Sequence, residues 1–398
     1  MKKQTNKRIR AHLLRNVFTL FALFAVCVIP FAVAQRAGKK PFVAEGVCPT
    51  PWQLVADMPV ELVGAAGASD GTFSYHAGGS NFTSGTLDVF NLYDPATDTW
   101  TPLPSMLQAV AAASAVYYPP TNKIYVFGGT SPDTGVVYDT TQIYDIASNT
   151  WSFGTSMPDV RFGMAAGYSG ATGKIYLVSG YNAFSASSAQ PDTWEYDPVM
   201  DTWADLTGSA PFPHPAGGFA SGVISDKLYI AGGRDAANQI INLTWEYDPV
   251  ANTYTPKADM PSGQNYAPGS AVALGNLWVF GGDDASIPPP PGRGSAEGVF
   301  GWTNAPFPWP VVKREQPLPD TVNTGRRYDA ATDTWSSFPN MNVDRSFPSG
   351  AAIQNKLIAA GGFNGSFFIA SAEVLDACIP GPRPTPTPRS RPTPRPRP

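Results

Sequence analysis

Few residues in this chain have the types and spacing that catalysis needs. Only two of its three histidines, His76 and His214, lie beyond the first 34 residues, and the sequence has no Cys/His metal cluster and no P-loop. His76 lies in an apolar run and is expected in the core, whereas His214 lies between two prolines and is expected to pack in a loop. The sequence therefore predicts no catalytic residue, no metal and no other cofactor.

Aromatic side chains are the other candidates for ligand contact. The proline-rich stretch SIPPPPGRGSAEGVFGWTNAPFPWPVVKREQP, residues 286–317, carries Phe300, Trp302, Phe307 and Trp309. Exposed aromatic rings stack on sugar faces or hold peptides, which makes Trp302 and Trp309 candidate ligand-binding residues. The alternative is a flap that packs these rings onto the body of the fold.

The elements that must position these residues repeat about every fifty positions. A motif of the form YD-x4-TW, with Tyr in place of Trp in one copy, recurs five times, at Tyr93–Trp100, Tyr144–Trp151, Tyr196–Trp203, Tyr247–Tyr254 and Tyr328–Trp335. An apolar run ending in glycine occurs six times, at Phe73–Gly79, Lys123–Gly129, Lys174–Gly180, Lys227–Gly233, Asn276–Gly282 and Lys356–Gly362. Small-residue strands and tight turns precede most of these runs. Each unit is therefore predicted to form four short β-strands.

A four-stranded sheet cannot bury both of its faces alone, and repetition around an axis solves this problem. With these six glycine runs and five YD motifs, the chain resembles kelch-repeat β-propellers of a secreted bacterial type. The resemblance covers about residues 52–376 and implies an all-β, six-bladed propeller. The fifth blade then contains an insert at about residues 283–323, in a loop on the face where the connections vary.

The sixth YD motif is divided between the two ends of the repeat region. The last glycine run is followed by Ala372–Asp376 without a tryptophan, whereas Trp52 precedes Met58-Pro59 much as Trp151 precedes its Met-Pro pair. We therefore expect the N-terminal strand to complete the last blade. By position, Cys48 and Cys378 map to the same point of the divided turn, so we predict a disulfide between them. Two unpaired thiols are the alternative.

The resemblance also suggests where a ligand would bind. In kelch proteins, residues four positions after the Met-Pro landmark lie at the rim of the central channel. In this chain these are Leu62, Val110, Arg161, His214, Gln264 and Arg345. Arg161 and Arg345 could hold a carboxylate through paired hydrogen bonds, and His214 and Gln264 complete the candidates. The alternative is that the arginines pair with Asp159 and Asp344 and order the loops.

The two ends of the chain differ from its body in charge. Residues 1–34 combine six Lys/Arg residues, the apolar run Val17–Ala32 and the small residues Ala32–Ala34, as a signal peptide does; an uncleaved membrane anchor is the alternative. Residues 35–47 form a linker, residues 48–379 the propeller, and residues 380–398 a Pro/Arg-rich tail of the kind that stays disordered. Of 27 basic residues, six lie in the leader and five in the tail, so the remainder carries 16 against 31 acidic residues, a net charge of −15.

Such an acidic body repels nucleic acid, and the mature chain has no membrane span. We expect a secreted or periplasmic, monomeric binding module for a protein, peptide or glycan, without chemistry of its own. The alternative is a sugar-acid mutarotase or epimerase, because six-bladed periplasmic enzymes such as N-acetylneuraminate epimerase resemble this chain in export, size and blade number. Its chemistry would need Arg161 or Arg345 together with Glu61 as the general acid/base. The copper oxidases of this fold need two histidines and a tyrosine–cysteine pair at one site, whereas both cysteines of the mature chain are assigned here to closure of the ring.

Overall fold

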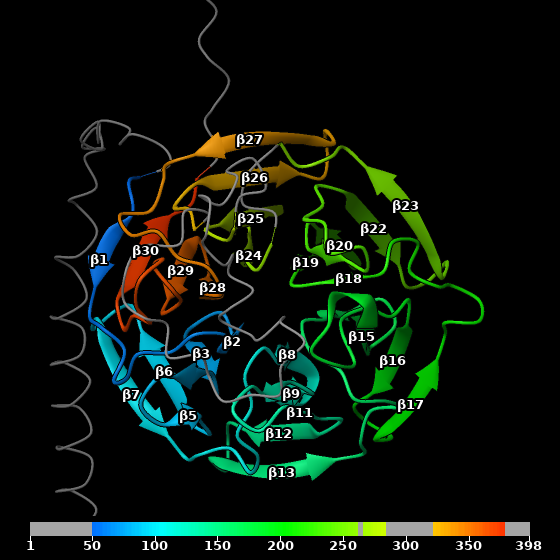
Figure 1. Ribbon diagram of the computed structural model, residues 1–398, viewed down its shortest axis with the longest axis horizontal. Helices are drawn as coiled ribbons and strands as arrows, with labels where there is room; N and C mark the ends of the chain where they lie inside the picture. The colour runs from blue at the N-terminus through cyan, green and yellow to red at the C-terminus, as the bar shows by residue number, and fades with distance from the viewer. Residues whose placement is uncertain (1–49, 262–265, 284–320, 379–398) are drawn as a thin grey trace, which may run out of the picture. The chain divides into compact units, whose positions relative to one another are not determined.

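The computed structural model describes residues 50–261, 266–283 and 321–378. The chain divides into two compact units, Met1–Gly46 and Val47–Pro398, and all described residues belong to the second. Six four-stranded antiparallel sheets surround an axis in this unit, as Figure 1 shows, and the predicted six-bladed propeller is confirmed. None of the described residues forms a helix with the length and hydropathy needed to cross a bilayer.

The strands of each blade are called a to d from the axis outwards. Blade 1 comprises β2 (Ala66–Ser69), β3 (Ser74–Ala77), β6 (Phe90–Asp94) and β7 (Thr99–Leu103). Blade 2 comprises β8 (Ser114–Tyr118), β9 (Lys123–Phe127), β12 (Thr141–Asp145) and β13 (Thr150–Gly154). Blade 3 comprises β14 (Ala165–Ser169), β15 (Lys174–Val178), β16 (Thr193–Asp197) and β17 (Thr202–Asp205). Blade 4 comprises β19 (Ala220–Ile224), β20 (Lys227–Ala231), β22 (Thr244–Asp248) and β23 (Thr253–Lys257). Blade 5 comprises β24 (Gly269–Ala273), β25 (Asn276–Phe280), β26 (Gly325–Asp329) and β27 (Thr334–Phe338). Blade 6 comprises β28 (Ser349–Ile353), β29 (Lys356–Ala360), β30 (Ala372–Asp376) and, as its outer strand, β1 (Gln53–Val55).

The last blade is closed by the N-terminal strand, as the divided motif predicts. Strand β1 pairs antiparallel with β30, and Leu54 lies opposite Glu373. In Figure 1 the blue β1 lies beside the red β30. The backbone N–H of Asp376 also donates to Thr50 Oγ1 at 3.1 Å, across 326 positions of sequence. Residues from the two ends of the repeat region therefore share one sheet.

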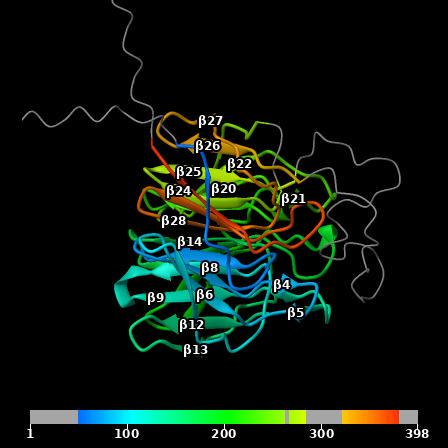
Figure 2. The same cartoon turned by 90° about the vertical axis from the view of Figure 1, so that its left-hand side faces the viewer.

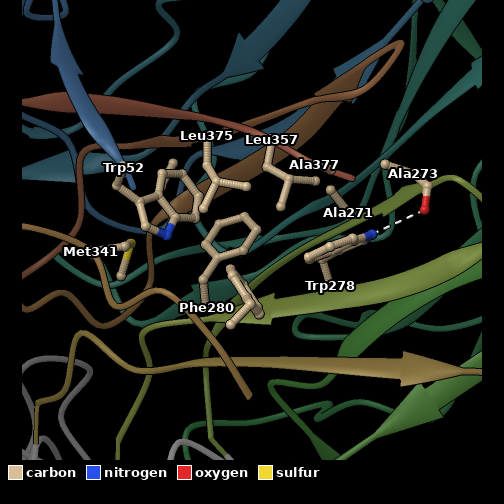
Figure 3. Packing of buried hydrophobic residues seen from close by; sticks show 11 residues of the cluster. Trp52, Ala271, Ala273, Trp278, Phe280, Met341, Leu357, Leu375 and Ala377 are labelled. Carbon is tan, nitrogen blue, oxygen red and sulfur yellow. Dashed lines mark hydrogen bonds between the residues drawn. The ribbon is translucent and has the colours of Figure 1, made fainter. Parts of the chain in front are cut away.

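Trp52 supplies the tryptophan that the sixth blade lacks. Its Nε1–H donates to the carbonyl of Pro339 in blade 5 at 3.0 Å, and its ring lies 5.2 Å from that of Phe280, edge to face. Figure 3 shows both rings in the core between blades 5 and 6. Four other tryptophans donate to the preceding blade in the same way at 2.8–2.9 Å: Trp100 to Ala56, Trp151 to Pro104, Trp203 to Thr155 and Trp335 to Ala258.

The repeated YD motifs form the turns between strands c and d. In blade 2, Asp145 Oδ1 accepts the backbone N–H groups of Ala147 and Ser148 at 3.0 Å. The hydroxyl of Tyr144 donates to Asn149 Oδ1 at 2.5 Å, and Asn149 takes the left-handed conformation that closes the turn (φ 57°). The same Tyr hydroxyl bond recurs in the other four motifs. These motifs therefore act as turn-forming structure.

A closed ring of six backbone hydrogen bonds joins the blades at the axis. Each blade contributes one residue, and each N–H donates to the carbonyl of the residue in the adjacent blade at 2.7–3.0 Å. In ring order, the residues are Gly64, Phe347, Ala267, Gly218, Gly163 and Ala112. All six have positive φ, between 48° and 70°. Three of them carry a Cβ, which disfavours this conformation.

Several predictions fall wholly or partly outside the described residues. They concern the leader, the linker, the Pro/Arg tail and most of the blade 5 insert, including Trp302 and Trp309. Cys378 is disulfide-bonded, but Cys48 lies outside the described residues, so the pairing of these two cysteines stays a prediction.

The neighbouring alanines Ala112 and Ala113 test the cost of the axial ring, because only Ala112 has positive φ (52°). Glycine removes a packed methyl group and adds backbone freedom to the unfolded chain at both positions, but it relieves left-handed strain only at position 112. We expect Ala112→Gly to be more stable than Ala113→Gly by about 1 kcal/mol in free energy of unfolding. Urea titration measures the difference, and equal stability would contradict the strain.

Candidate binding surface around the axial channel

The propeller has two faces with different connections. The b–c and d–a loops share one face, here called the variable face, and the a–b and c–d turns share the other. Small two-stranded sheets build up the variable face. Two are hairpins, β4 (Ser80–Asn81) with β5 (Gly85–Thr86) and β10 (Thr130–Ser131) with β11 (Val136–Val137), and the third pairs β18 (Ala216–Gly217), before blade 4, with β21 (Arg234–Asp235) in its b–c loop. Figure 2 shows β4, β5 and β21 on the same side of the blades.

The axial channel opens on this face as two adjoining cavities. The outer one, about 130 Å³, lies at the ring of backbone hydrogen bonds, and its aromatic walls are Phe162, Tyr181, Phe219, Tyr266 and Phe347. The inner one, about 190 Å³, is lined by inner-strand residues that include Ser114, Ser221 and Ser270. The two cavities share one residue from each connection: Ala65, Ala113, Met164, Phe219, Pro268 and Pro348. The mouth is therefore apolar and the interior polar.

Arg345 is a structural residue between blades 5 and 6. Its side chain is fully buried, and Nη2 donates to Glu373 Oε1 at 2.7 Å. Nη1 donates to the carbonyls of Gly361 and Ser371 at 2.9 and 2.8 Å. Burial lowers the pKa of the guanidinium, and the Glu373 carboxylate opposes this shift. The predicted pairing with Asp344 is replaced by a stronger contact with the closing blade.

Arg161 is also buried, with 1% of its surface exposed. Nη2 donates to Asp192 and, at 3.3 Å, to Asp159, and the guanidinium lies 4.7 Å from the ring centre of Trp194. Burial lowers the pKa of Arg161, and both carboxylates oppose that shift. The pairing with Asp159 agrees with the loop-ordering alternative. Both arginines hold carboxylates, but these belong to the protein itself.

The remaining rim candidates are not brought together. In five glycine runs the N–H of the last glycine donates to a backbone carbonyl in the next d–a connection, which marks equivalent positions in these connections. Between blades 3 and 4 this carbonyl belongs to Ala216. His214 lies two residues earlier, with Nε2 3.4 Å from Asp235 Oδ2. Gln264 lies outside the described residues, and Glu61 is half-buried. The connection between blades 3 and 4 contains extra residues, so Ala216 and not His214 occupies the rim position expected from the Met-Pro landmark.

His76 is a core residue, as expected from its strand. It is fully buried between blades 1 and 6, with Nδ1 2.7 Å from Ser349 Oγ and Nε2 3.0 Å from Ser74 Oγ. Its ring lies 5.0 Å from that of Trp100. Burial lowers the pKa of His76 to about 3, so the imidazole is neutral near neutral pH. No group of three or more His, Cys, Asp and Glu residues within the described part of the chain could hold a metal ion.

One G-x-S-x-G sequence, the motif of a serine nucleophile, occurs at Gly67–Gly71. In the structure it belongs to the a–b turn of blade 1. Ser69 Oγ donates to the carbonyl of Phe73 at 2.9 Å and accepts the N–H of Gly71 at 3.0 Å. A hydrolase nucleophile of this type stands on a strand-to-helix turn beside a histidine. Ser69 therefore stabilises a turn.

The variable face is strongly acidic. Its described b–c and d–a connections carry eleven acidic residues: Asp57, Glu61, Asp88, Asp133, Asp139, Asp159, Asp192, Asp235, Asp259, Asp283 and Asp344. The same connections carry three arginines, Arg161, Arg234 and Arg345, and each is less than 5% exposed. Asp283 is fully buried, whereas the other ten acidic residues are partly or fully exposed, so the accessible charge of these connections is negative.

Two exposed aromatic residues also lie on the variable face and were missed by the sequence analysis. Phe82 and Phe367, in the b–c loops of blades 1 and 6, are 49% and 50% exposed. Phe82 stacks on Phe368 with ring centres 3.8 Å apart, which joins the two loops. Neither loop has a repeat motif, so no sequence pattern indicated these rings.

Comparison with known proteins places this architecture in a family. The KLHDC2/KLHL20/DRC7 Kelch-repeats domain matches residues 64–282. The chain belongs to the kelch-repeat family. Kelch-like protein terF of Aspergillus terreus is 28% identical over 223 residues, which are 53% of this chain and 47% of that protein. Kelch-like protein 25 of Xenopus tropicalis is 25% identical over 251 residues, 61% of this chain and 36% of that protein.

The kelch match thus spans less than half the length of these two relatives. Among solved structures, the one entitled "Structure of YjhT" superposes with a TM-score of 0.61 at 16% identity, covering 80% of this chain and 95% of that one. This likeness shows the shared propeller fold. Kelch propellers typically serve as protein-interaction modules.

Substitution of Arg345 is expected to act on stability. Arg345→Met leaves the Glu373 carboxylate buried without its cation, which costs about 3–5 kcal/mol of unfolding free energy. Lys356→Met, which breaks the exposed pair with Asp376, is the matched control and costs less than about 1 kcal/mol. Denaturant titration compares them; similar losses in both variants would show that Arg345 is not a structural cation.

The buried His76 predicts acid sensitivity. Its folded-state pKa of about 3 lies below the ordinary value of 6.5, so its contribution to stability is complete above pH 6.5 and is lost as the pH falls towards 3. The loss approaches roughly 1.4 kcal/mol per pH unit. In His76→Gln this component is absent, and the difference in unfolding free energy between wild type and variant should shrink on acidification. A difference independent of pH would contradict a neutral buried imidazole.

Proposed function

We propose that this kelch propeller binds a basic polypeptide on its variable face and carries out no chemistry itself. The observation that carries the proposal is the charge of that face. Its connections contain eleven carboxylates, of which only Asp283 is buried, and three arginines, which are all buried. Complementary charge speeds association and selects partners of the opposite sign. The exposed rings of Phe82 and Phe367 offer apolar contact beside these carboxylates.

The same geometry argues against an anionic sugar as the ligand. An epimerase or mutarotase acting on sugar acids would need an accessible cation, and the two arginines assigned to this task are buried and paired with Asp192 and Glu373. A sugar carboxylate would have to displace a buried carboxylate of the protein, which is costly. A neutral glycan remains a second type of ligand, to be separated from a peptide by experiment.

A peptide array tests the proposal with a defined probe. The full-length protein is applied to 15-residue peptides of equal apolar content with net charges of +4, 0 and −4. We expect selective binding to the cationic set, weakened at least tenfold between 50 and 200 mM salt, as for contacts between accessible charges. Phe82→Ser with Phe367→Ser should reduce binding, whereas Phe153→Ser, which removes a 55% exposed ring from the outer strand β13, should not.

Three results would contradict this function. These are equal binding to all three peptide sets, binding to a glycan array without binding to peptides, and accelerated anomerisation of a sialic acid followed by NMR. Each result separates the binding module from one of the alternatives.

We further propose that the chain is exported and that Cys48 pairs with Cys378. The basic and apolar leader supports export, and the bonded state of Cys378 supports a cystine. Mass mapping of a non-reduced digest should yield a peptide linked through both cysteines and an N-terminus at Gln35. Free thiols at both positions, or an intact leader, would reject the corresponding half of this proposal.

A further inference from the structure

We propose that the chain's own C-terminal segment, residues 380–398, binds the acidic variable face. This inference rests on the proposed function, because it assigns an occupant to the same surface. The two are separable, since the face could bind other basic peptides and not this one.

The carboxylates available for such binding lie mainly on the variable face. On the opposite face, the repeated motifs pair their aspartates with lysines at the start of strand b: Lys123 with Asp145, Lys174 with Asp197, Lys227 with Asp248 and Lys356 with Asp376. Other aspartates of those turns accept tyrosine hydroxyls. By contrast, Asp57 and Asp88 are exposed in connections that contain no arginine, and Asp344 is exposed next to the buried Arg345.

The C-terminal segment has the complementary chemistry. It contains five arginines, nine prolines and no acidic residue. Proline alternation favours a preformed extended chain, which loses little conformational entropy on binding, and aromatic surfaces are common partners of such chains. Arginine forms paired hydrogen bonds with carboxylates. The half-exposed rings of Phe82 and Phe367 stand on the same face as the carboxylates.

The length of the segment is sufficient for this contact. Strand β30 ends at Asp376, on the face opposite the variable face. A five-residue strand spans about 17 Å, and nineteen residues in an extended polyproline conformation span about 60 Å. The segment can therefore pass over the outer edge of blade 6 and reach the carboxylates of the variable face, in the same molecule or in a second copy.

The test uses the full chain with its tail arginines replaced by glutamine (Arg383→Gln, Arg389→Gln, Arg391→Gln, Arg395→Gln and Arg397→Gln), which leaves the face open. A fluorescent synthetic peptide of residues 380–398 is titrated in, and anisotropy gives the dissociation constant. We expect saturable binding at 50 mM salt that weakens at least tenfold at 200 mM, and no binding of the peptide with five glutamines.

The binding face is located by two charge-matched triple variants. Asp57→Asn, Asp88→Asn and Asp344→Asn on the variable face should weaken peptide binding at least tenfold. Asp94→Asn, Asp145→Asn and Asp329→Asn remove the same charge from the opposite face and keep an amide oxygen for each turn, so binding should stay within twofold. Thermal melts establish that both variants are folded.

Two outcomes would overturn the inference. One is that the arginine peptide binds no better than its glutamine counterpart, and the other is that both triple variants weaken binding equally. If the cationic array peptides still bind under those conditions, the proposed function stands and only the assigned occupant is wrong.

Discussion

The ring of six hydrogen bonds around the axis is the constraint on which the other features depend. Each blade contributes one N–H and one carbonyl, and the ring closes only when every blade supplies a residue with positive φ. Three glycines meet this condition without strain, whereas Ala112, Ala267 and Phe347 meet it at a cost. The same residues line the outer cavity. The ring that fixes the spacing of the blades thus also sets the width of the channel mouth.

Most of the fold could be predicted from sequence because it depends on repeated local chemistry. The YD motif specifies its own turn through an aspartate, a left-handed Asn or Asp and a tyrosine hydroxyl, so each copy carries its structure with it. The position of Trp52 was readable for the same reason, because five complete motifs show what the sixth must contain. The axial ring was not readable, since Gly, Ala and Phe share no side-chain pattern and only their backbone conformation is common.

The site was predictable in place but not in detail. The variable connections do form one face around the channel, yet Arg345 meets Glu373 on a strand that pairs with residues from the other end of the repeats. From the sequence, the adjacent Asp344 is the obvious partner for Arg345, whereas Glu373 becomes its neighbour only in the folded chain. His214 was misaligned because the blade 3 to blade 4 connection has additional residues. The acidity of the variable face was not predicted, because it requires knowing which acidic residues lie in the b–c and d–a connections and which lie in the turns of the opposite face.

The divided sixth blade also has a consequence for the order of synthesis. Strand β1 leaves the ribosome before any other strand of the propeller, but β30 is the last strand to be made. Strand β1 therefore has no partner strand until more than 300 further residues have been translated. Blades 1 to 5 can each form as soon as their own four strands have emerged, whereas the sixth sheet and the closed ring cannot form until β30 has been made.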